Sequence, residues 1–241
     1  MYSIGEGFRK AFQLIFSLDA ELLGIVFLSL KVSGLALFVS SVTGISFGAF
    51  IGLKQHPENA KVLRALRWLI ISLMNTFMGL PPVVLGLFLY LILSRSGPLG
   101  FMGLLYSPTA MVIAQGILAF PIIGALSHSA IVSVDPIIRQ ASMSLGATSS
   151  QVTATIIKEV RYGIMSGVIA GFGRVMAEVG AILIVGGNIA GYTRVMTTTI
   201  ALETDKGNFE LALALGIILL ILSFAVNMTL YLIQKKGHKI N

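Results

Sequence analysis

Residues 211–234 read LALALGIILLILSFAVNMTLYLIQ, a run of 24 positions without a charged side chain. An α-helix needs about 20 apolar residues to cross about 30 Å of hydrocarbon, so this stretch predicts a membrane-spanning helix. The whole chain of 241 residues is 56% hydrophobic and only 11% charged, with a mean hydropathy of +0.91. Soluble domains carry about 25% charged residues. The composition therefore argues against a soluble enzyme, a nucleic-acid-binding module or a disordered chain, and it indicates a polytopic membrane protein.

Four windows of similar character precede this stretch. They are free of Asp, Glu, Lys and Arg except for Lys31 in the first window and, in the fourth, Arg161 at its start and Arg174 and Glu178 within it. We therefore predict an all-α membrane protein with a single domain over residues 1–241. Its five predicted spans cover about residues 22–53, 68–94, 107–130, 161–188 and 211–234.

The N-terminal stretch Phe8–Ser17 differs from these windows. It is short, carries Arg9 and Lys10, and places its apolar side chains at helical spacing. An amphipathic helix on the membrane surface fits this pattern better than a span. A signal peptide is the competing interpretation, disfavoured by Asp19, by Glu21 and by the lack of a small-x-small cleavage site. If the first 30 residues crossed the membrane instead, the chain would have six spans.

Basic residues are distributed unevenly among the connections between the predicted spans. Ten Lys and Arg lie in residues 54–67, in residues 133–161 and in the C-terminal tail, whereas the other connections hold three. Because basic residues collect on the cytoplasmic side of a membrane protein, we predict a cytoplasmic C-terminus. With five spans, the N-terminus would then lie outside.

Arg174 and Glu178 are charged residues well inside a predicted span. An unpaired charge at mid-membrane costs about 2.5–3.5 kcal/mol on insertion scales. The two residues are four positions apart, which would place them on one face of a helix as an ion pair. Such a pair could be an electrostatic element or gate beside an anion pathway, or it could be structural, and the sequence leaves both interpretations open.

Other candidates for a pathway are polar residues and glycines within or near the spans. A glycine cluster can expose backbone N–H groups to an oxyanion, and a basic residue outside the membrane could attract one. The tandem prolines Pro81 and Pro82 should also kink or break the second span. The remaining pathway candidates are Asn75, Thr76, Gly186, Gly187, Asn188 and Arg194.

Residues 135–160 form a long connection on the predicted cytoplasmic side that is not composed like a linker. Pro136 suits the first position of a helix, and apolar residues from Ile137 onward predict a short helix. Gly146 follows with a run of small residues, and a second helix is predicted from Gln151. This helix–Gly–helix element could be a docking surface for a cytoplasmic partner or a hairpin that packs on the bundle.

The segment 139–147, with the sequence RQASMSLGA, resembles the EAA motif of ABC importer permeases. Gln140-Ala141-Ser142 stands where the family has Glu-Ala-Ala, Gly146 stands for its Gly, and Ile156 for its later Ile. The chain departs from the family pattern because Gln140 is not acidic and because no Pro follows Ile156. The resemblance implies that ATPase coupling involves the residues Arg139, Gln140, Ala141, Ser142, Leu145, Gly146, Ala147 and Ile156.

Other segments resemble permeases for sulfate, molybdate and tungstate, most closely those for tungstate. They are residues 79–84, 94–100, 171–181 and 186–194. The resemblance implies the type I permease fold in a bacterial or archaeal inner membrane, with tungstate as the imported substrate and molybdate or sulfate as alternatives. It also implies a second permease copy in a homodimer, two ABC ATPase subunits that bind ATP and Mg, an extracytoplasmic oxyanion-binding protein and surrounding lipid.

Two other classes of function were compared with this interpretation. A membrane-embedded enzyme would need a catalytic constellation, but the chain has no Cys and its three His are far apart in sequence. We therefore expect no metal site, no bound cofactor and no catalytic residue in this chain.

The other class is an ATP-independent oxyanion channel. No Gly-Lys-Ser/Thr loop follows the glycine cluster, so ATP hydrolysis would belong to a partner.

Overall fold

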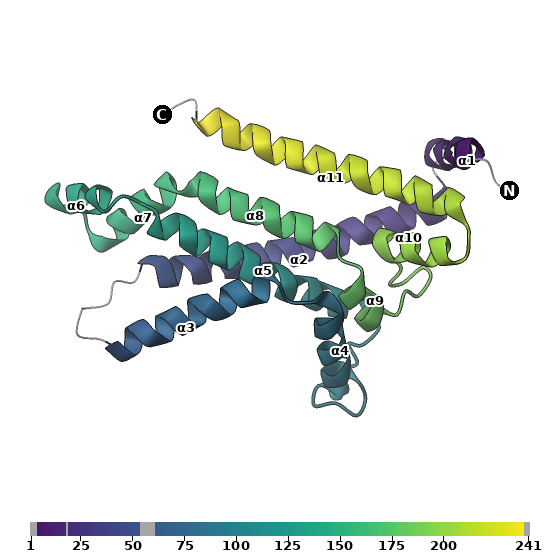
Figure 1. The fold of residues 1–241 in the computed structure, drawn as a ribbon, viewed down its shortest axis with the longest axis horizontal. Helices are drawn as coiled ribbons and strands as arrows, with labels where there is room; N and C mark the ends of the chain where they lie inside the picture. Colours follow the sequence, from purple (N-terminus) through teal and green to yellow (C-terminus); the bar gives the residue numbers. More distant parts are fainter. Residues whose placement is uncertain (1–3, 18, 54–60, 239–241) are drawn as a thin grey trace. The chain divides into compact units, whose positions relative to one another are not determined.

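The computed structural model describes residues 4–17, 19–53 and 61–238, and every regular element in this part of the chain is helical (Figure 1). The all-α prediction is confirmed. Lys54, His56 and Lys239 lie outside the described residues. In chain order the elements are α1 (Ile4–Phe16), α2 (Ala20–Leu53), α3 (Lys61–Met78), α4 (Pro82–Leu93), the short 3-10 helix η1 (Gly100–Met102), α5 (Pro108–Val132), α6 (Pro136–Ser144), α7 (Ser149–Glu159), α8 (Arg161–Met176), α9 (Gly180–Gly186), α10 (Met196–Asp205) and α11 (Phe209–His238).

Three of the described helices are long and apolar enough to cross a membrane, namely α2, α5 and α11. Two helix pairs, α3 with α4 and α8 with α9, also meet this test when each is taken as one bent span. By length and composition this gives up to five spans. The helices overlap the five predicted windows, but the second and fourth windows are each divided into two helices.

The division between α3 and α4 follows from the tandem prolines. Pro82 occupies the first turn of α4, where its missing N–H leaves no helical hydrogen bond unmade. The Gly79 N–H donates to the Thr76 carbonyl at 3.1 Å, which closes the last turn of α3. The predicted break of the second span is therefore confirmed.

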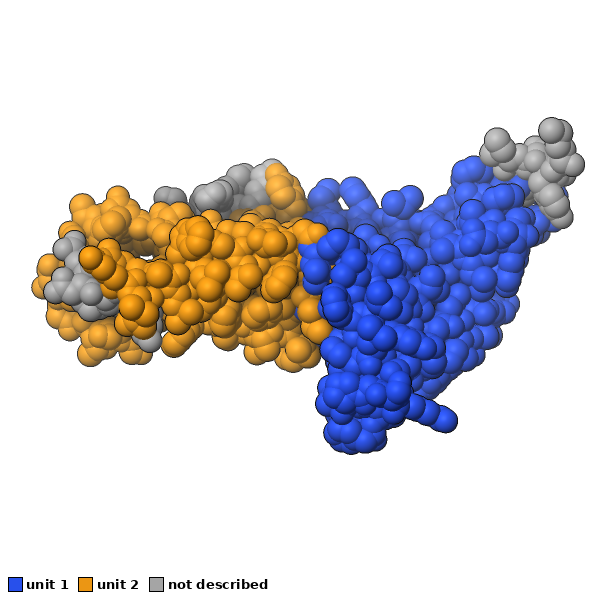
Figure 2. Space-filling view, turned by 60° about the horizontal axis from the view of Figure 1, so that its bottom comes forward, with its two compact units in different colours: residues 1–36, 80–116, 173–229 blue, residues 37–79, 117–172, 230–241 orange. Residues whose placement is uncertain are grey.

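Contacts group the chain into two compact units, coloured separately in Figure 2. Unit 1 comprises residues 1–36, 80–116 and 173–229, and unit 2 comprises residues 37–79, 117–172 and 230–241. Within unit 1, α4 packs along α9 (Figure 1). The two helices approach so closely that a Cβ atom on Gly86 would lie 2.9 Å from the Ala181 Cα. Small residues at a helix contact allow such close packing.

Helix α1 has the two-sided character predicted for an amphipathic surface helix. Ala11 is fully buried, and the Lys10 Nζ lies 2.5 Å from the Glu210 Oε1 at the start of α11. Phe8, Phe12 and Phe16 are exposed, and their spacing of four places them along one side of the helix. The described part of α1 thus presents an unpaired aromatic side, as a helix lying at a membrane surface would.

Within unit 2, α2 approaches α5 through glycines spaced four residues apart. A Cβ atom on Gly48 would collide with the Gly124 carbonyl oxygen, which is backbone and cannot move aside easily. A Cβ atom on Gly44 would lie 3.2 Å from the Gly124 nitrogen. This face of α2 therefore accepts no larger side chain.

We predict that Gly48→Ala destabilises the protein by about 1–3 kcal/mol, because the added methyl overpacks the contact between α2 and α5. Gly34→Ala is the matched control in the same helix, since no described residue outside the helix backbone lies within 4 Å of a Cβ atom there. Alanine is the better helix former, so the control should be neutral or stabilising by up to about 1 kcal/mol. Thermal unfolding in detergent measures both, and equal melting temperatures for the two variants would contradict the packing argument.

Candidate functional site

The helix–Gly–helix element begins at a capped helix. Asp135 is the N-cap of α6, and its Oδ1 accepts the Ile137 N–H at 2.9 Å. Pro136 takes the first helical position, as predicted. The cap satisfies one of the free N–H groups of the first turn. Helix α6 therefore starts at a defined residue even though it is only nine residues long.

Gly146 ends α6 for a reason that only glycine meets easily. Its φ is +80°, in the left-handed region. Its N–H donates to the Met143 carbonyl at 3.0 Å, and the Ala147 N–H donates to the Ser142 carbonyl at 3.1 Å. This is the Schellman pattern of helix termination. Gly146 thus sets the direction in which the chain leaves α6.

Helix α7 anchors the element to the bundle of unit 2. Thr148 and Gln151 form a reciprocal capping box at its start. Val152 and Ile156 are buried in an apolar cluster with Ile131, and Ala147 packs against that cluster. Ile156, one of the predicted coupling residues, is therefore a core side chain, so any part it takes in coupling would be as an anchor.

Helix α6, by contrast, presents apolar side chains to solvent. Ile137 and Met143 are exposed, and Leu145 is 88% exposed. Gln140, Ala141 and Gly146 are exposed as well, whereas Ser142 and Ala147 are partly buried. Arg139 holds α6 in place, because its Nη2 donates to the Leu53 carbonyl at the end of α2, at 3.3 Å. Exposed apolar side chains on a helix fixed in this way are typical of a docking surface.

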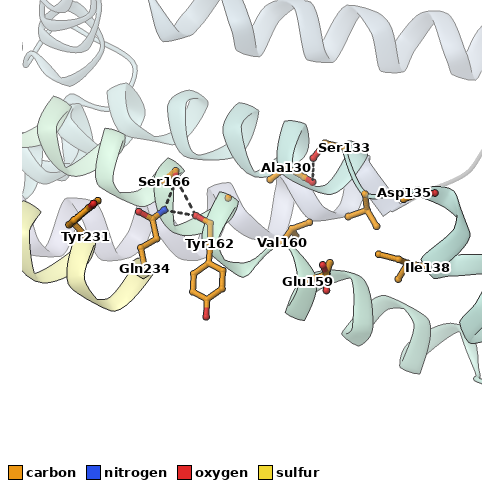
Figure 3. Close-up of a pocket in the computed structure, with 12 residues that line it drawn as sticks. Ala130, Ser133, Asp135, Ile138, Glu159, Val160, Tyr162, Ser166, Tyr231 and Gln234 are labelled. Carbon is orange, nitrogen blue, oxygen red and sulfur yellow. Dashed lines mark hydrogen bonds between the residues drawn. The ribbon is translucent and has the colours of Figure 1, made fainter. Parts of the chain in front are cut away.

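A cavity of about 720 Å³ lies beside this element in unit 2 (Figure 3). Asp135, Ile138 and Glu159 line it, with Tyr162 and Tyr231. The Gln234 Nε2 at its edge donates to the Tyr162 carbonyl at 2.8 Å and to the Ser166 Oγ at 2.7 Å, which ties α11 to α8. This contact of Gln234 was not predicted, because its partners on α8 are about 70 residues away in sequence.

Arg174, on α8, contacts the backbone at the break between α3 and α4, the two helices of the second predicted span. The Arg174 Nη2 donates to the Leu80 carbonyl at 3.1 Å and lies 3.8 Å from the Glu178 Oε2. Leu80 lies between α3 and α4, where the helical hydrogen-bond ladder is interrupted. A carbonyl freed at membrane depth needs a partner inside the protein, and Arg174 supplies it.

Glu178 supplies a hydrogen-bond acceptor at the second break, which lies between α8 and α9. Helix α8 ends at Met176 and α9 begins at Gly180, so Glu178 lies between them. The prediction that Arg174 and Glu178 share a helix face is therefore wrong, although the two still form an ion pair. The physical reason is that the Glu178 Oε1 accepts the Ala181 N–H at 2.8 Å, at the start of α9. Its carbonyl accepts the Thr197 hydroxyl, also at 2.8 Å.

Gln115 on α5 was not among the predicted site residues. It is buried, and its Nε2 donates to the Val175 carbonyl at 3.1 Å, in the last turn of α8. It also lies 3.4 Å from the Ser33 Oγ. The break between α8 and α9 is thus supported from a third helix.

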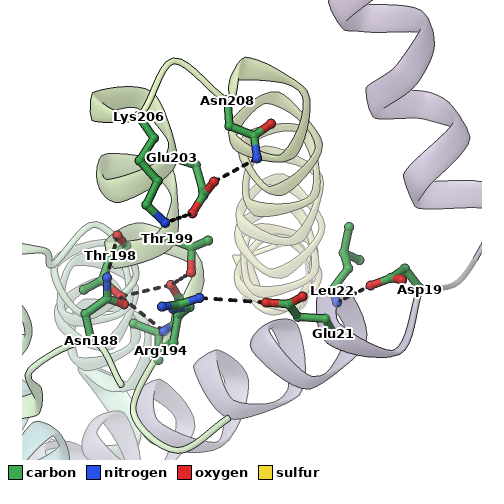
Figure 4. A network of polar contacts seen from close by, with 11 residues as sticks. Asp19, Glu21, Leu22, Asn188, Arg194, Thr198, Thr199, Glu203, Lys206 and Asn208 are labelled. Atoms are coloured by element: carbon green, nitrogen blue, oxygen red, sulfur yellow. Dashed lines mark hydrogen bonds and ion pairs between the residues drawn. The ribbon is translucent and has the colours of Figure 1, made fainter. Parts of the chain in front are cut away.

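The predicted pathway residues near the C-terminal end of the fourth window are largely hydrogen-bonded within the protein. The Asn188 amide pairs with Thr198, accepting its hydroxyl at 2.9 Å and donating to its carbonyl at 3.5 Å (Figure 4). The Gly187 N–H donates to the Leu183 carbonyl and caps α9.

Asn75 and Thr76 lie near the end of α3, where the Thr76 hydroxyl donates to the Ser72 carbonyl. Their part in a pathway stays a prediction.

Arg194 lies in a region where several charged side chains gather, as Figure 4 shows. Its Nη1 is 3.8 Å from the Glu21 Oε1. Glu203, a buried residue of α10, accepts the Lys206 Nζ at 2.9 Å and the Asn208 Nδ2 at 2.8 Å. The hydrogen bond from Lys206 lowers the pKa of Glu203 most strongly. The hydrogen bond from Asn208 and the positive charges of Lys206 and Arg194 lower the pKa further. Burial of the carboxyl group acts in the opposite direction and raises the pKa.

Residues 35–237 match the family described as the binding-protein-dependent transport system inner membrane component. The chain belongs to this family. It is 41% identical to the tungstate uptake system permease protein TupB of Peptoclostridium acidaminophilum, over 98% of this chain and 100% of that protein. It is also 41% identical to a probable anion ABC transporter permease protein of Haloferax volcanii, over 86% of this chain and 88% of that protein. The molybdenum transport system permease protein ModB of Escherichia coli K12 is 33% identical, over 70% and 74% of the two chains.

Among solved structures, a chain of the MetNI methionine ABC transporter in inward-facing conformations has a TM-score of 0.69 with 18% identity. The match covers 89% of this chain and 95% of that chain. It concerns the fold alone and confirms the predicted permease fold. Membership of the inner-membrane component family likewise confirms that the chain is a membrane transport component.

We predict that Glu203→Gln lowers the melting temperature of the permease near neutral pH. A carboxylate whose pKa is lowered on folding stabilises the protein above its ordinary pKa and loses this effect as the pH falls through its folded value. The gap between wild type and variant should therefore shrink below about pH 4.3, the ordinary value for glutamate. A gap that stays constant on acidification would show that the charge of Glu203 is not what stabilises α10.

Proposed function

We propose that this chain is the permease subunit of an ATP-driven ABC importer that carries tungstate into the cell. The observation that supports this most strongly is the 41% identity to a tungstate uptake permease over nearly the full length of both proteins. The chain would lie in the inner membrane of a bacterium or archaeon, with its C-terminus in the cytoplasm. The uneven distribution of basic residues supports that orientation.

Two features suggest the partners that we propose. One is the lack of an ATP-binding loop in the sequence, and the other is the exposed apolar side chains on α6. The sequence has no phosphate-binding Gly-Lys-Ser/Thr loop, so ATP and Mg would bind to a separate ATPase and this chain would hold no cofactor. The complete transporter would contain two permease copies and two ATPases. An extracytoplasmic oxyanion-binding protein would deliver the substrate and supply most of the discrimination, because a pathway must bind its substrate weakly enough to release it.

Helix α6 is the proposed contact with the ATPase. Its exposed apolar side chains would dock on the ATPase, and the anchored helix α7 would carry the movement into the bundle of unit 2. ATP-driven closure of the two ATPases would then switch the pathway between outward and inward access. Gln140 is neutral, so docking at this position would rest on apolar contacts rather than on a salt bridge.

Import of another oxyanion is the main alternative, because specific observations favour it. Import of molybdate is supported by the 33% identity to ModB, and sulfate import by the resemblance of several segments to sulfate permeases. An ATP-independent oxyanion channel is an alternative of another class, which the transport experiment below distinguishes from the importer.

Reconstitution in liposomes with the ATPase and binding protein of the same organism tests this proposal. We expect uptake of tungstate that requires ATP inside the vesicles and the binding protein outside, and that exceeds uptake of molybdate and sulfate. A preference for molybdate or sulfate would favour the related importers. Uptake by the permease alone, without ATP, would favour the channel.

We predict that Leu145→Asp uncouples the transporter. An aspartate at this apolar contact would carry a desolvated charge into the docking surface, so ATP-driven uptake should fall by about tenfold or more. Leu145→Met is the matched control, because it keeps the apolar character and should retain uptake. Leu145 is exposed, so neither variant should change the melting temperature of the isolated permease. Normal uptake by Leu145→Asp would contradict the assignment of α6 as the docking helix.

A further inference from the structure

We propose that Arg174 is an oxyanion contact within the translocation pathway, and that Glu178 limits how tightly it holds the anion. This inference rests on the proposed function. It gives Arg174 a second role, contact with the transported anion, in addition to its hydrogen bond with the Leu80 carbonyl.

The depth of Arg174 restricts what can surround it. It lies 13 residues after the start of α8, about 20 Å along the helix axis, in a window long enough for one span. Its side chain is nevertheless 27% exposed. Charged side chains at such depth face the interior of a bundle or a water-filled cavity rather than lipid. The Leu80 backbone beside it, which is not helical, is subject to the same restriction.

The guanidinium group has unused capacity for hydrogen bonding. Among the described residues, its hydrogen bond to Leu80 and its ion pair with Glu178 both come from Nη2. Its Nε is buried and has no hydrogen-bond partner in the part of the chain that the structure describes. Arginine carries five N–H donors in a planar fork that fits the edge of an oxyanion. The contacts to Leu80 and Glu178 therefore fix the orientation of Arg174 while leaving donors for a ligand.

Glu178 explains how such a site could still release its anion. Its side chain is only 2% exposed, and one oxygen is engaged by the Ala181 N–H. The other oxygen lies 3.8 Å from Arg174, so its negative charge opposes an anion bound there. A symmetric homodimer would hold one such pair of Arg174 and Glu178 in each copy. The ligand class that fits is a tetrahedral dianionic oxyanion.

Two other basic residues, Arg194 and Lys31, fit this role less well. Arg194 also has a buried Nε without a hydrogen-bond partner among the described residues, but it lies in the connection between α9 and α10, outside the candidate spans, where it is close to Glu21 and Glu203. Lys31 lies in α2, and its flexible side chain can extend along the helix surface towards water. Lys31 is therefore a useful comparison residue for an experiment.

The chain contains no cysteine, so Arg174→Cys would give the permease a single thiol. We would treat the reconstituted transporter with small hydrophilic methanethiosulfonates of equal size, one cationic and one neutral, and follow labelling of the permease by mass. Loss of a charge-assisted hydrogen bond is worth about 10- to 100-fold, so uptake should fall by at least about tenfold. The cationic reagent should restore uptake, the neutral reagent should not, and saturating tungstate should slow labelling.

Lys31→Cys serves as the control, and tungstate should not slow its labelling. Equal protection of both positions, or no labelling of Cys at position 174, would overturn the inference. Failure of the wild-type transporter to carry tungstate, molybdate or sulfate would instead overturn the proposed function.

A second variant keeps the inference testable if Arg174→Cys fails to assemble. Glu178→Gln removes the charge but keeps an acceptor for the Ala181 N–H. We expect slower maximal uptake and inhibition by tungstate on the inner side at a concentration about tenfold lower, because the anion leaves more slowly. A lower melting temperature with unchanged uptake and unchanged inhibition would show that the pair is structural only.

Discussion

The structure depends on a constraint that the bilayer imposes on two interrupted helices. Inside hydrocarbon, every backbone group that a break frees must find a partner within the protein. Arg174 binds the Leu80 carbonyl at the break between α3 and α4, while Glu178 binds the Ala181 N–H at the break between α8 and α9. Their ion pair joins the two breaks, and Gln115 supports the end of α8 from a third helix.

This junction allows short helices to exist in an apolar chain. Helices α4 and α9 are each too short to span a bilayer, yet they pack closely through Gly86 and Ala181. In unit 2, Gly146 and the core residues of α7 fix a different kind of element, one that exposes apolar side chains. The first arrangement provides a charged group in an otherwise apolar region, and the second exposes Ile137, Met143 and Leu145 at a helix of fixed position. Both are features expected of a permease that is driven by a separate ATPase.

Much of this was predictable from the sequence because it depends on composition and local chemistry. Apolar windows identify helices, tandem prolines break one of them, and a glycine between two short helices predicts a turn. The break at residues 177–179 could not be found in this way, because no proline marks it. Glu178 leaves the helix to cap α9, and hydropathy does not reveal hydrogen-bond partners. Gln115 and Gln234 were missed for the same reason, since their partners are 60 and 72 residues away in sequence. Glu203 was missed although its partners Lys206 and Asn208 follow within five positions, because the sequence does not show that its side chain is buried.

The central claim is that Arg174 and Glu178 act together to hold both breaks. A double-mutant cycle tests it most directly, using the unfolding free energies of wild type, Arg174→Met, Glu178→Gln and the double variant in detergent. Residues in contact typically show coupling energies of about 0.5–3 kcal/mol. We predict that each single variant is destabilised and that the double variant loses less than the sum of the two. Strictly additive losses would contradict the account.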